Sequence, residues 1–202
     1  MLEDRDQRIR ALVRFVRNER RLREGARLSQ RDVAFRAGIH YTEIGLLERY
    51  ERMPRAGTLV RLFSALDSDP WELLEGLAWE LDGRRAEPAA VGRPSSPDGR
   101  GRTVVPDPMV RFGLLLTRER LRSGLRQEEV GDLLRMHRTE ISLIERGGRQ
   151  PRLDVLLQLA AAVEAGPADL LSGIHWIPGD TIIGGRYAAS VEQLDLLGAG
   201  AG

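Results

Sequence analysis

The chain has 202 residues, which is enough for one domain or for two small ones. Its 31 basic residues nearly balance 30 acidic ones, so the net charge of +1 does not by itself indicate a nucleic-acid or membrane partner. The absence of cysteine excludes disulfides, thiolate metal sites and a cysteine nucleophile. The sequence shows neither a signal-like apolar segment at its start nor a run of 18 apolar residues, which predicts a cytoplasmic protein without a membrane span.

Two stretches of the chain are near copies of each other. "HYTEIGLLERYERMP", which begins at His40, returns as "HRTEISLIERGGRQP", which begins at His137, and the offset of 97 residues is the difference between these histidines. The same offset aligns the flanking segments, residues 28–34 with 125–131 and residues 68–79 with 165–176. An internal repeat of this length favours two related domains.

Upstream of this region the copies align best at an offset of 99 residues, which pairs "RRLREG" with "ERLRSG". The change of offset predicts two extra residues in the first copy, Ala26 and Arg27. Insertions are tolerated in loops, so we expect a longer connection between the first two helices of this copy. The copies then span about residues 7–79 and 107–176.

Apolar residues recur within each copy with the period of a helix. An example is the i, i+3, i+4, i+7 stripe formed by Leu59, Leu62, Phe63 and Leu66. Pro54 is expected to end a helix, whereas Pro70 suits the first turn of one. The pattern predicts five helices in each copy, at residues 7–24, 30–37, 41–50, 56–66 and 70–79 and at residues 107–122, 127–134, 138–146, 153–164 and 167–175.

The segment between the copies has the composition of a linker. Residues 82–108 contain five of the ten prolines together with four glycines, and such a composition cannot bury a core. After Trp176, β-branched residues flank Gly184 and Gly185, which fits either a small β-hairpin or a disordered tail. We therefore expect a first domain at residues 1–82, a linker at 83–106, a second domain at 107–176, and a tail or hairpin at 177–202.

The second and third expected helices of each copy are short and about three residues apart, a spacing typical of a helix-turn-helix. The runs "LSQRDVAFRAGIHYTEIGLLER" and "LRQEEVGDLLRMHRTEISLIERGG" are each followed by a proline and an apolar helix. They resemble the phage-repressor and Cro-type helix-turn-helix family, also called the xenobiotic-response-element family. The resemblance covers both copies and implies an all-α fold of two five-helix, lambda-repressor-like domains in tandem, with the small β-hairpin as an option near the C-terminus.

The resemblance also implies where the protein contacts DNA phosphates. Gln30 and Gln127 open the second helices, where free N–H groups and the helix dipole suit an anion; a simply solvated residue is the alternative. At the start of each third helix, where the family has Ser or Thr, the chain has histidine, which predicts a poorer cap that can still touch phosphate. Arg49 and Arg146 end the third helices and either reach phosphate or remain solvated. The histidines are His40 and His137.

Base-reading positions are implied on the exposed face of the third helices. In the first copy they are Tyr41, Thr42 and Leu46, and in the second they are Arg138, Thr139 and Leu143. An Arg can bind guanine with two hydrogen bonds and a Leu can contact a thymine methyl. A minor core role is the alternative for the two leucines. Because Gly45 weakens the first of these helices, we expect the second copy to discriminate sequences more strongly.

Other repeated residues are expected to be structural. Glu48 and Glu145 match the family's glutamate that pairs with an Arg on the first helix, here expected to be Arg21 and Arg120. Gly38 and Arg135 occupy the same place in the turn, so a positive φ there would strain the arginine by about 1 kcal/mol. The repeated tryptophans, Trp79 and Trp176, are expected in the core of their own copies, with an inter-repeat contact as the alternative.

Catalytic and metal-binding patterns are scarce, so we predict no enzyme, no metal and no cofactor. The predicted function is sequence-specific binding of double-stranded DNA by a bacterial transcriptional regulator with two recognition helices. The alternative, left open by the near-zero net charge, is an adaptor that binds a component of the transcription machinery through the same helices. Expected partners are double-stranded DNA and, as an option, a second copy of the chain, with no membrane and no evident small-molecule ligand.

Overall fold

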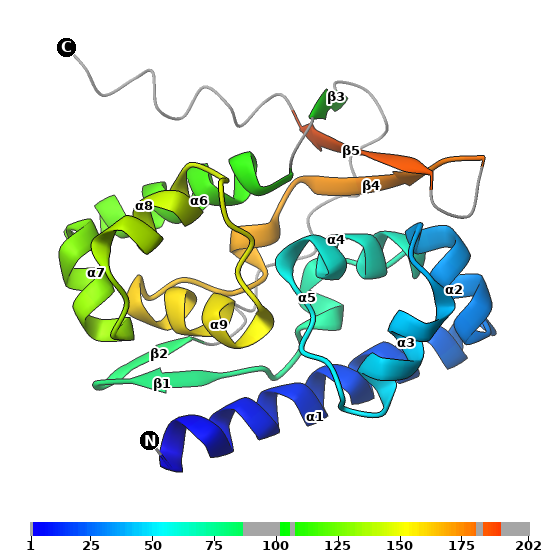
Figure 1. Cartoon of the computed structure of the whole chain (residues 1–202), viewed down its shortest axis with the longest axis horizontal. Coiled ribbons are helices and arrows are strands. Elements are labelled where there is room, and N and C mark those ends of the chain that lie inside the picture. Colours follow the sequence, from blue (N-terminus) through cyan, green and yellow to red (C-terminus); the bar gives the residue numbers. More distant parts are fainter. Residues whose placement is uncertain (1, 87–101, 106–107, 181–183, 191–202) are drawn as a thin grey trace.

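The computed structural model describes residues 2–86, 102–105, 108–180 and 184–190 (Figure 1). Of the expected linker at 83–106, residues 87–101 and 106 lie outside the described residues, whereas 84–86 and 102–105 form strands. Of the expected tail or hairpin at 177–202, residues 181–183 and 191–202 lie outside the described residues. The chain is mainly helical and contains two helix-turn-helix units, as expected. The helices of the first copy are α1 (Leu2–Gly25), α2 (Gln30–Ala37), α3 (Tyr41–Glu48), α4 (Ala56–Ala65) and α5 (Pro70–Leu73). Those of the second copy are α6 (Pro108–Arg122), α7 (Gln127–Leu134), α8 (Arg138–Glu145) and α9 (Leu153–Ala162), with a 3-10 turn at Asp169–Leu171.

Each copy ends in antiparallel strands. The strands are β1 (Trp79–Leu81), β2 (Arg84–Ala86), β3 (Arg102–Val105), β4 (Ile174–Pro178) and β5 (Gly185–Ser190). β1 pairs with β2, whereas β5 lies between β3 and β4, which confirms the option of a hairpin near the C-terminus. The fifth helices expected at 70–79 and 167–175 are too long. Gly76 (φ 67°) and Gly173 (φ 66°) adopt the left-handed conformation at equivalent positions and direct the chain into the strands instead.

The first helices of the two copies end at equivalent positions. Arg27 (φ 56°) and Gly124 (φ 70°) both leave the helix in the left-handed conformation, and they are separated by the same 97 residues as the rest of the repeat. The expected insertion of Ala26 and Arg27 is therefore wrong. The similar "RLR" triplets of the two helices are two residues out of structural register, and the repeat continues without interruption into α1 and α6.

The two copies meet through a pair of equivalent backbone hydrogen bonds. Ala56 N–H donates to the carbonyl of Pro151 at 2.9 Å, and Leu153 N–H donates to the carbonyl of Pro54 at 2.8 Å. The second bond joins the counterparts of the two residues that form the first, which makes the contact isologous, as in a twofold dimer. In Figure 1, a half-turn about the viewing direction exchanges α2 and α3 with α7 and α8. The chain is thus a pseudo-twofold dimer within one polypeptide.

These two bonds satisfy groups that the helices leave unpaired. Ala56 and Leu153 are the first residues of α4 and α9, and the first N–H groups of a helix have no acceptor within it. Arg55 and Arg152 precede these helices without a capping side chain and form an antiparallel bridge with each other. The carbonyl of the opposite copy therefore supplies an acceptor for the helix N-terminus.

The strands of each copy pack on the fourth helix of the other copy. β1 and β2 lie against α9, where Arg84 Nη1 donates to the carbonyl of Ala162 at 3.0 Å and to Glu164 Oε1 at 2.8 Å. β4 lies against α4, where Trp176 N–H donates to Ser64 Oγ at 2.9 Å. Buried apolar residues of both copies form one hydrophobic core. Separating the copies would expose this core to water.

Trp176 lies between the copies. Its indole N–H donates to the carbonyl of Arg36 at 3.1 Å, and the guanidinium of Arg61 sits 4.2 Å from the centre of its ring. Arg61 Nε also donates to the Tyr187 hydroxyl at 2.7 Å, and Tyr187 packs edge-on against the indole. The expectation that Trp176 belongs to the core of its own copy is wrong, because the strand that carries it reaches across the pseudo-twofold axis.

We expect the two halves to remain associated when the chain is cut between them. If a protease site is introduced within residues 87–101 and cleaved, both fragments should elute together in size-exclusion chromatography, because their shared core stays buried. A mixture of the fragments after denaturation and refolding should also elute as the complex. Two separate peaks near 10 kDa, by the roughly 110 Da mass of an average residue applied to halves of this length, would contradict the shared core.

Candidate nucleic-acid interface

The turns of the two helix-turn-helix units share one backbone geometry. α2 ends at Gly38 with φ 61° and α7 ends at Arg135 with φ 54°, so the turn requires the left-handed conformation in both copies. The expected strain at Arg135 is therefore present and costs about 1 kcal/mol. At Gly38 a side chain is excluded for a second reason, since a Cβ there would lie 2.6 Å from Trp176 Cζ2.

The histidines before the third helices act as caps. His40 Nδ1 accepts the N–H of Thr42 at 3.4 Å and lies 2.7 Å from its hydroxyl oxygen. His137 repeats the arrangement with Thr139, at 3.3 Å and 2.8 Å. An accepting Nδ1 places the proton of the neutral ring on Nε2, which leaves an exposed N–H donor beside the helix N-terminus. The cap is therefore present in both copies, with histidine in place of serine or threonine as its acceptor.

Gln30 and Gln127 are the first residues of α2 and α7, at the ends where the helix dipole is positive. Gln127 Nε2 donates to Glu145 Oε2 at 2.6 Å, which holds the side chain close to the end of α8. The amide keeps a second N–H for another acceptor. Both glutamines are therefore placed where a phosphate can meet the helix N-terminus.

The implied base-reading residues lie on the outer side of α3 and α8. Tyr41 is 50 % exposed, and Thr42, Arg138 and Thr139 are also exposed. The two leucines differ, because Leu46 is partly buried whereas Leu143 is 38 % exposed. The second helix therefore offers the more accessible apolar contact.

The arginines that end the recognition helices are exposed and held by neighbouring side chains. Arg49 makes two hydrogen bonds to Glu51, from Nε at 2.7 Å and from Nη2 at 3.2 Å. Arg146 Nη1 donates to Ser142 Oγ at 2.5 Å. Arg49 must therefore share its guanidinium with a carboxylate if it also reaches a phosphate, whereas Arg146 faces only a neutral hydroxyl.

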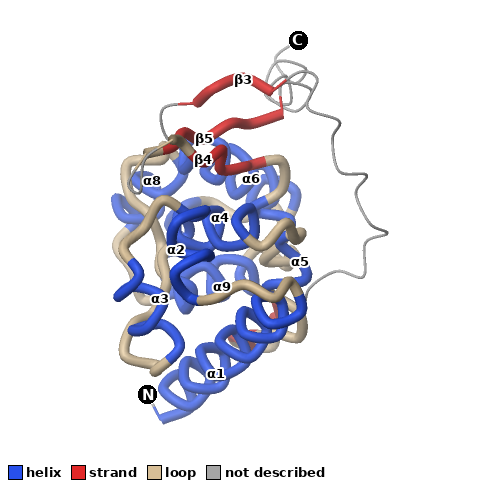
Figure 2. Tube along the Cα trace, turned by 90° about the vertical axis from the view of Figure 1, so that its right-hand side faces the viewer, coloured by secondary structure: helices blue, strands red, loops and turns tan. Residues whose placement is uncertain are grey.

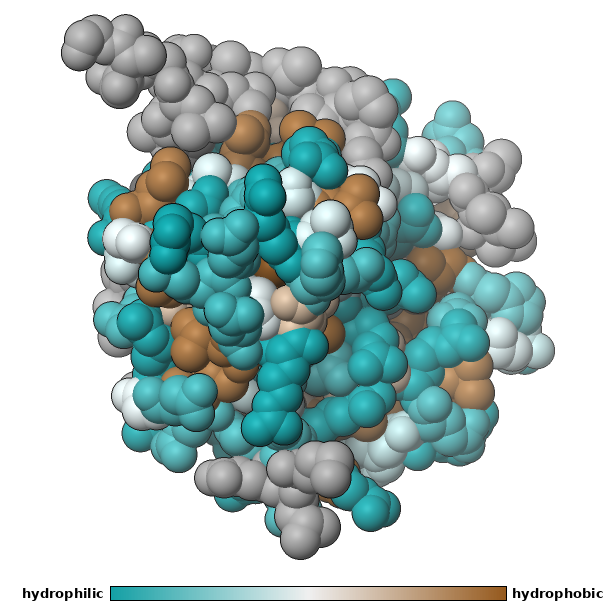
Figure 3. Space-filling view, turned by 60° about the vertical axis from the view of Figure 1, so that its left-hand side comes forward, coloured by the Kyte–Doolittle hydropathy of each residue, from teal (hydrophilic) through white to brown (hydrophobic). Residues whose placement is uncertain are grey.

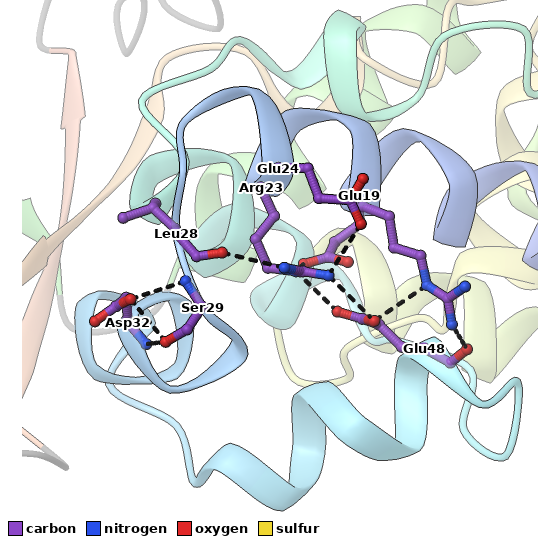
Figure 4. A network of polar contacts seen from close by, with 8 residues as sticks. Glu19, Arg23, Glu24, Leu28, Ser29, Asp32 and Glu48 are labelled. Carbon is purple, nitrogen blue, oxygen red and sulfur yellow. Dashed lines mark hydrogen bonds and ion pairs between the residues drawn. The ribbon is translucent and has the colours of Figure 1, made fainter.

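A buried ion pair fixes the end of each recognition helix. In the second copy Arg120 Nε donates to Glu145 Oε1 at 2.6 Å, which confirms the expected pair. In the first copy the equivalent donor is Arg23, whose Nε lies 2.9 Å from Glu48 Oε1 (Figure 4). The expected partner, Arg21, instead pairs with Glu75. The error follows from the assumed offset of 99 residues, since the true offset of 97 aligns Arg23 with Arg120.

The first copy buries a second carboxyl group beside this pair. Glu19 is 2 % exposed, and among the described residues neither of its carboxyl oxygens has a hydrogen-bond partner. Burial, together with the nearby carboxyl of Glu48, raises the pKa of Glu19 to about 8, although Arg23 and Arg20 oppose the shift. The counterpart of Glu19 is Leu116, which is buried in the second copy. The first copy thus has a buried carboxyl group at a position where the second copy has an apolar side chain.

The two recognition helices lie on the same side of the molecule, on the left in Figure 2. The loops that follow them run antiparallel through the centre of Figure 1, where Arg55 and Arg152 form their bridge. Both arginines are exposed, and Arg152 also donates to Asp154 at 2.9 Å. Sequence reasoning missed this central pair, although each arginine follows the proline that closes the repeated phrase.

Comparisons with known proteins identify a helix-turn-helix in each copy. A family model described as helix-turn-helix matches residues 20–73, and a model described as helix-turn-helix domain matches residues 111–172. A solved structure, the restriction-modification controller protein C.AhdI from Aeromonas hydrophila, is 35 % identical over 31 % of this chain and 94 % of that chain, with a TM-score of 0.30. The search of curated proteins gave no match. Within the described residues, no helix is long and apolar enough to cross a membrane.

We expect Glu19→Leu to stabilise the protein in a pH-dependent manner. The pKa of Glu19 is about 8 in the folded chain and 4.5 ordinarily, so between these values the folded chain keeps a proton that the unfolded chain has lost. The free energy of unfolding should therefore fall as pH rises across this window and level off above it. Because one pKa unit corresponds to about 1.4 kcal/mol, the variant should gain a few kcal/mol at pH 8 and little at pH 5.

Urea unfolding at a series of pH values measures this effect. Glu24→Leu is the matched control, because Glu24 is an exposed carboxylate on the same helix and its replacement should leave the pH dependence unchanged. An identical pH slope for wild type and Glu19→Leu would show that Glu19 is ionised like an ordinary surface carboxylate.

Proposed function

Because the chain belongs to the helix-turn-helix family of Cro- and repressor-type DNA-binding proteins, we propose that it is a bacterial transcriptional regulator that binds as a single-chain dimer. In this proposal, α3 and α8 enter successive major grooves on one side of the double helix. The observation that supports it most directly is the isologous contact between Pro54, Ala56, Pro151 and Leu153, which relates the two units by a half-turn. Two recognition helices related in this way suit half-sites about one helical turn, roughly 34 Å, apart.

Phosphate binding is assigned to the ends of the helices. Gln30 and Gln127 each combine an amide N–H with the positive end of a helix dipole. The Nε2–H groups of His40 and His137 point away from the caps that their Nδ1 atoms form, and can donate to the same backbone. Arg146 and, after release from Glu51, Arg49 extend these contacts along the strand.

Sequence reading is assigned to the exposed side chains of the third helices. Arg138 and Thr139 carry the polar contacts of α8, and Leu143 offers a methyl contact. In α3, Tyr41 and Thr42 take the equivalent places, whereas Leu46 contributes less because it is partly buried.

The central arginines complete the proposed interface. Arg55 and Arg152 lie between the two units, where the DNA backbone must pass from one half-site to the other. Arg55 adds positive charge at this point, and Arg152 does so after release from Asp154. Phosphate affinity depends on this local charge and not on the near-zero net charge of the whole chain.

An adaptor function is the second candidate, and the surface argues against it. Protein docking uses a contiguous apolar patch, which is larger than single exposed apolar side chains. The face that carries α7 and α8 is mainly hydrophilic, with apolar side chains in small separate groups (Figure 3).

The family also points to a regulator that binds DNA and does not catalyse a reaction, in the cytoplasm and without a membrane partner. In the part of the chain that the structure describes, no cluster of acidic or histidine side chains could hold a metal.

We expect the combined replacement of Gln30 and Gln127 by Ala to weaken binding to every DNA sequence. A hydrogen bond to a charged group contributes about 1.5 to 3 kcal/mol, so the affinity should fall at least tenfold for cognate and random duplexes alike. Fluorescence anisotropy with labelled duplexes measures this loss. Gln158→Ala on α9 is the control, because Gln158 lines the same hollow as Leu81 and Gly83 of the first copy and is not one of the proposed DNA contacts. Unchanged affinity of the double variant would remove the phosphate role.

We expect the combined change Arg55→Gln and Arg152→Gln to reduce the salt dependence of binding. Each phosphate contact contributes about 0.9 to the slope of log affinity against log salt, so the slope should fall by one to two. Arg17→Gln is the matched control, because Arg17 lies beside Gly76 and Trp79 on the side of α1. If both variants keep the wild-type slope, the DNA does not cross the pseudo-twofold axis at this bridge.

A further inference from the structure

The two helix-turn-helix units differ at one pair of facing positions. We call α2–α3 the first head and α7–α8 the second head. In the first head, the guanidinium of Arg31 lies 5.7 Å from the centre of the Tyr41 ring. In the second head, Glu128 Oε1 lies 3.7 Å from Arg138 Nη1. Both pairs join the second residue of the second helix to the first residue of the recognition helix, and their members are related by the offset of 97 residues.

The two pairs present opposite chemistry to DNA. The first head combines a cation with an aromatic ring, so it attracts phosphate and has one polar hydroxyl for the bases. The second head combines a carboxylate with a guanidinium, so its charges cancel before DNA arrives. Both side chains of this pair are more than half exposed, at 61 % for Arg138 and 56 % for Glu128. An exposed pair of this kind is weak and separates easily.

When bound DNA excludes water from the second head, the negative charge of Glu128 must be balanced by the positive charge of Arg138. This requirement makes the second head selective. A guanine accepts two hydrogen bonds from Arg138 through O6 and N7, while the remaining N–H groups can stay beside Glu128. At another base Arg138 lacks these two acceptors and is held less firmly beside Glu128. The negative charge of Glu128 is then repelled more strongly by the DNA. The first head carries no carboxylate at the equivalent position, since Arg31 stands there.

The covalent connection keeps these unlike heads together. A dimer of identical chains presents identical heads and reads a palindrome. In this chain, the bonds between Pro54, Ala56, Pro151 and Leu153 always pair a first head with a second head.

We infer that the protein recognises a directional operator of two different half-sites in fixed order and spacing, with the Arg31–Tyr41 and Glu128–Arg138 pairs assigning each half-site to its head. This inference rests on the proposed DNA-binding function. It names the class of site as non-palindromic and identifies Glu128 as a specificity-determining residue. One chain should occupy one operator.

The first experiment selects binding sites for the full chain from random duplexes. The selected sequences should contain two distinct half-motifs at constant spacing, and native mass spectrometry should show one chain for each duplex. Binding to no duplex at low salt would overturn the proposed function and this inference with it. Selection of a palindrome, or two chains on one site, would overturn this inference alone.

The second experiment compares the selected composite site with the two palindromes made by doubling either half. Wild type should bind the composite roughly tenfold more tightly than either palindrome, since a mismatched base pair changes affinity by about five- to 150-fold. The double variant Arg31→Glu with Tyr41→Arg gives the first head the pair of the second. Its preference should move to the palindrome of the second half-site, and an unchanged preference would overturn the assignment of these residues.

A third variant separates selectivity from folding. Glu128→Gln keeps the size of the side chain and removes its charge, so it should tighten binding to mismatched duplexes several-fold more than binding to the composite site. Thermal unfolding should remain as in wild type, because the pair is exposed. Glu51→Gln is the matched comparison, since it removes the carboxylate that pairs with Arg49 at the far end of α3 and should tighten binding to all duplexes equally. An equal gain on all duplexes for Glu128→Gln would show that Glu128 affects affinity without setting specificity.

Discussion

The exchange of two backbone hydrogen bonds between the copies is the constraint on which the rest of the structure depends. Ala56 and Leu153 begin helices that lack capping side chains, and each N–H finds its acceptor in a proline carbonyl of the opposite copy. The bonds fix the relative rotation of the copies, because an isologous contact permits only a half-turn between them. The position of α3 relative to α8 follows from that rotation.

The exchanged strands then decide which positions can differ between the copies. Trp176 packs against Gly38, so the turn of the first head has no room for a side chain. The equivalent Arg135 is exposed and keeps its side chain despite the same left-handed backbone. The shared scaffold therefore tolerates unlike residues at its surface while the backbone geometry of both heads stays the same.

The ion pairs beneath the recognition helices are also shared by the two copies, while the residues around them differ. Arg23 with Glu48 and Arg120 with Glu145 are equivalent, because each holds the last turn of a helix that must be presented rigidly. The surrounding groups differ, since the buried Glu19 of the first copy has a raised pKa and its counterpart in the second copy is Leu116. Breaking the Arg120–Glu145 pair by removing the arginine would leave a buried charge without compensation, which costs about 3 to 5 kcal/mol. Glu48 would keep Arg20 as a second partner.

The sequence by itself determined the helices of the two heads and the surface residues they carry. α2 and α7 begin and end where the pattern predicts, and α3 and α8 begin at the expected residues, because periodicity and caps are local signals. It also placed Tyr41, Thr42, Arg138 and Thr139 on exposed positions, since helical spacing decides which face a side chain occupies.

Only the tertiary structure decided how the copies fit together. The strands β1 and β4 take the last residues of the expected fifth helices and find partners on the opposite copy, and Trp176 crosses the axis with β4. Arg23 takes the place expected for Arg21 because α1 and α6 pack at an offset of 97 residues, whereas their similar RLR triplets align at an offset of 99. The facing pairs Arg31–Tyr41 and Glu128–Arg138 join different helices of a head. Contacts of this kind depend on how elements distant in sequence pack, and no local pattern encodes that packing.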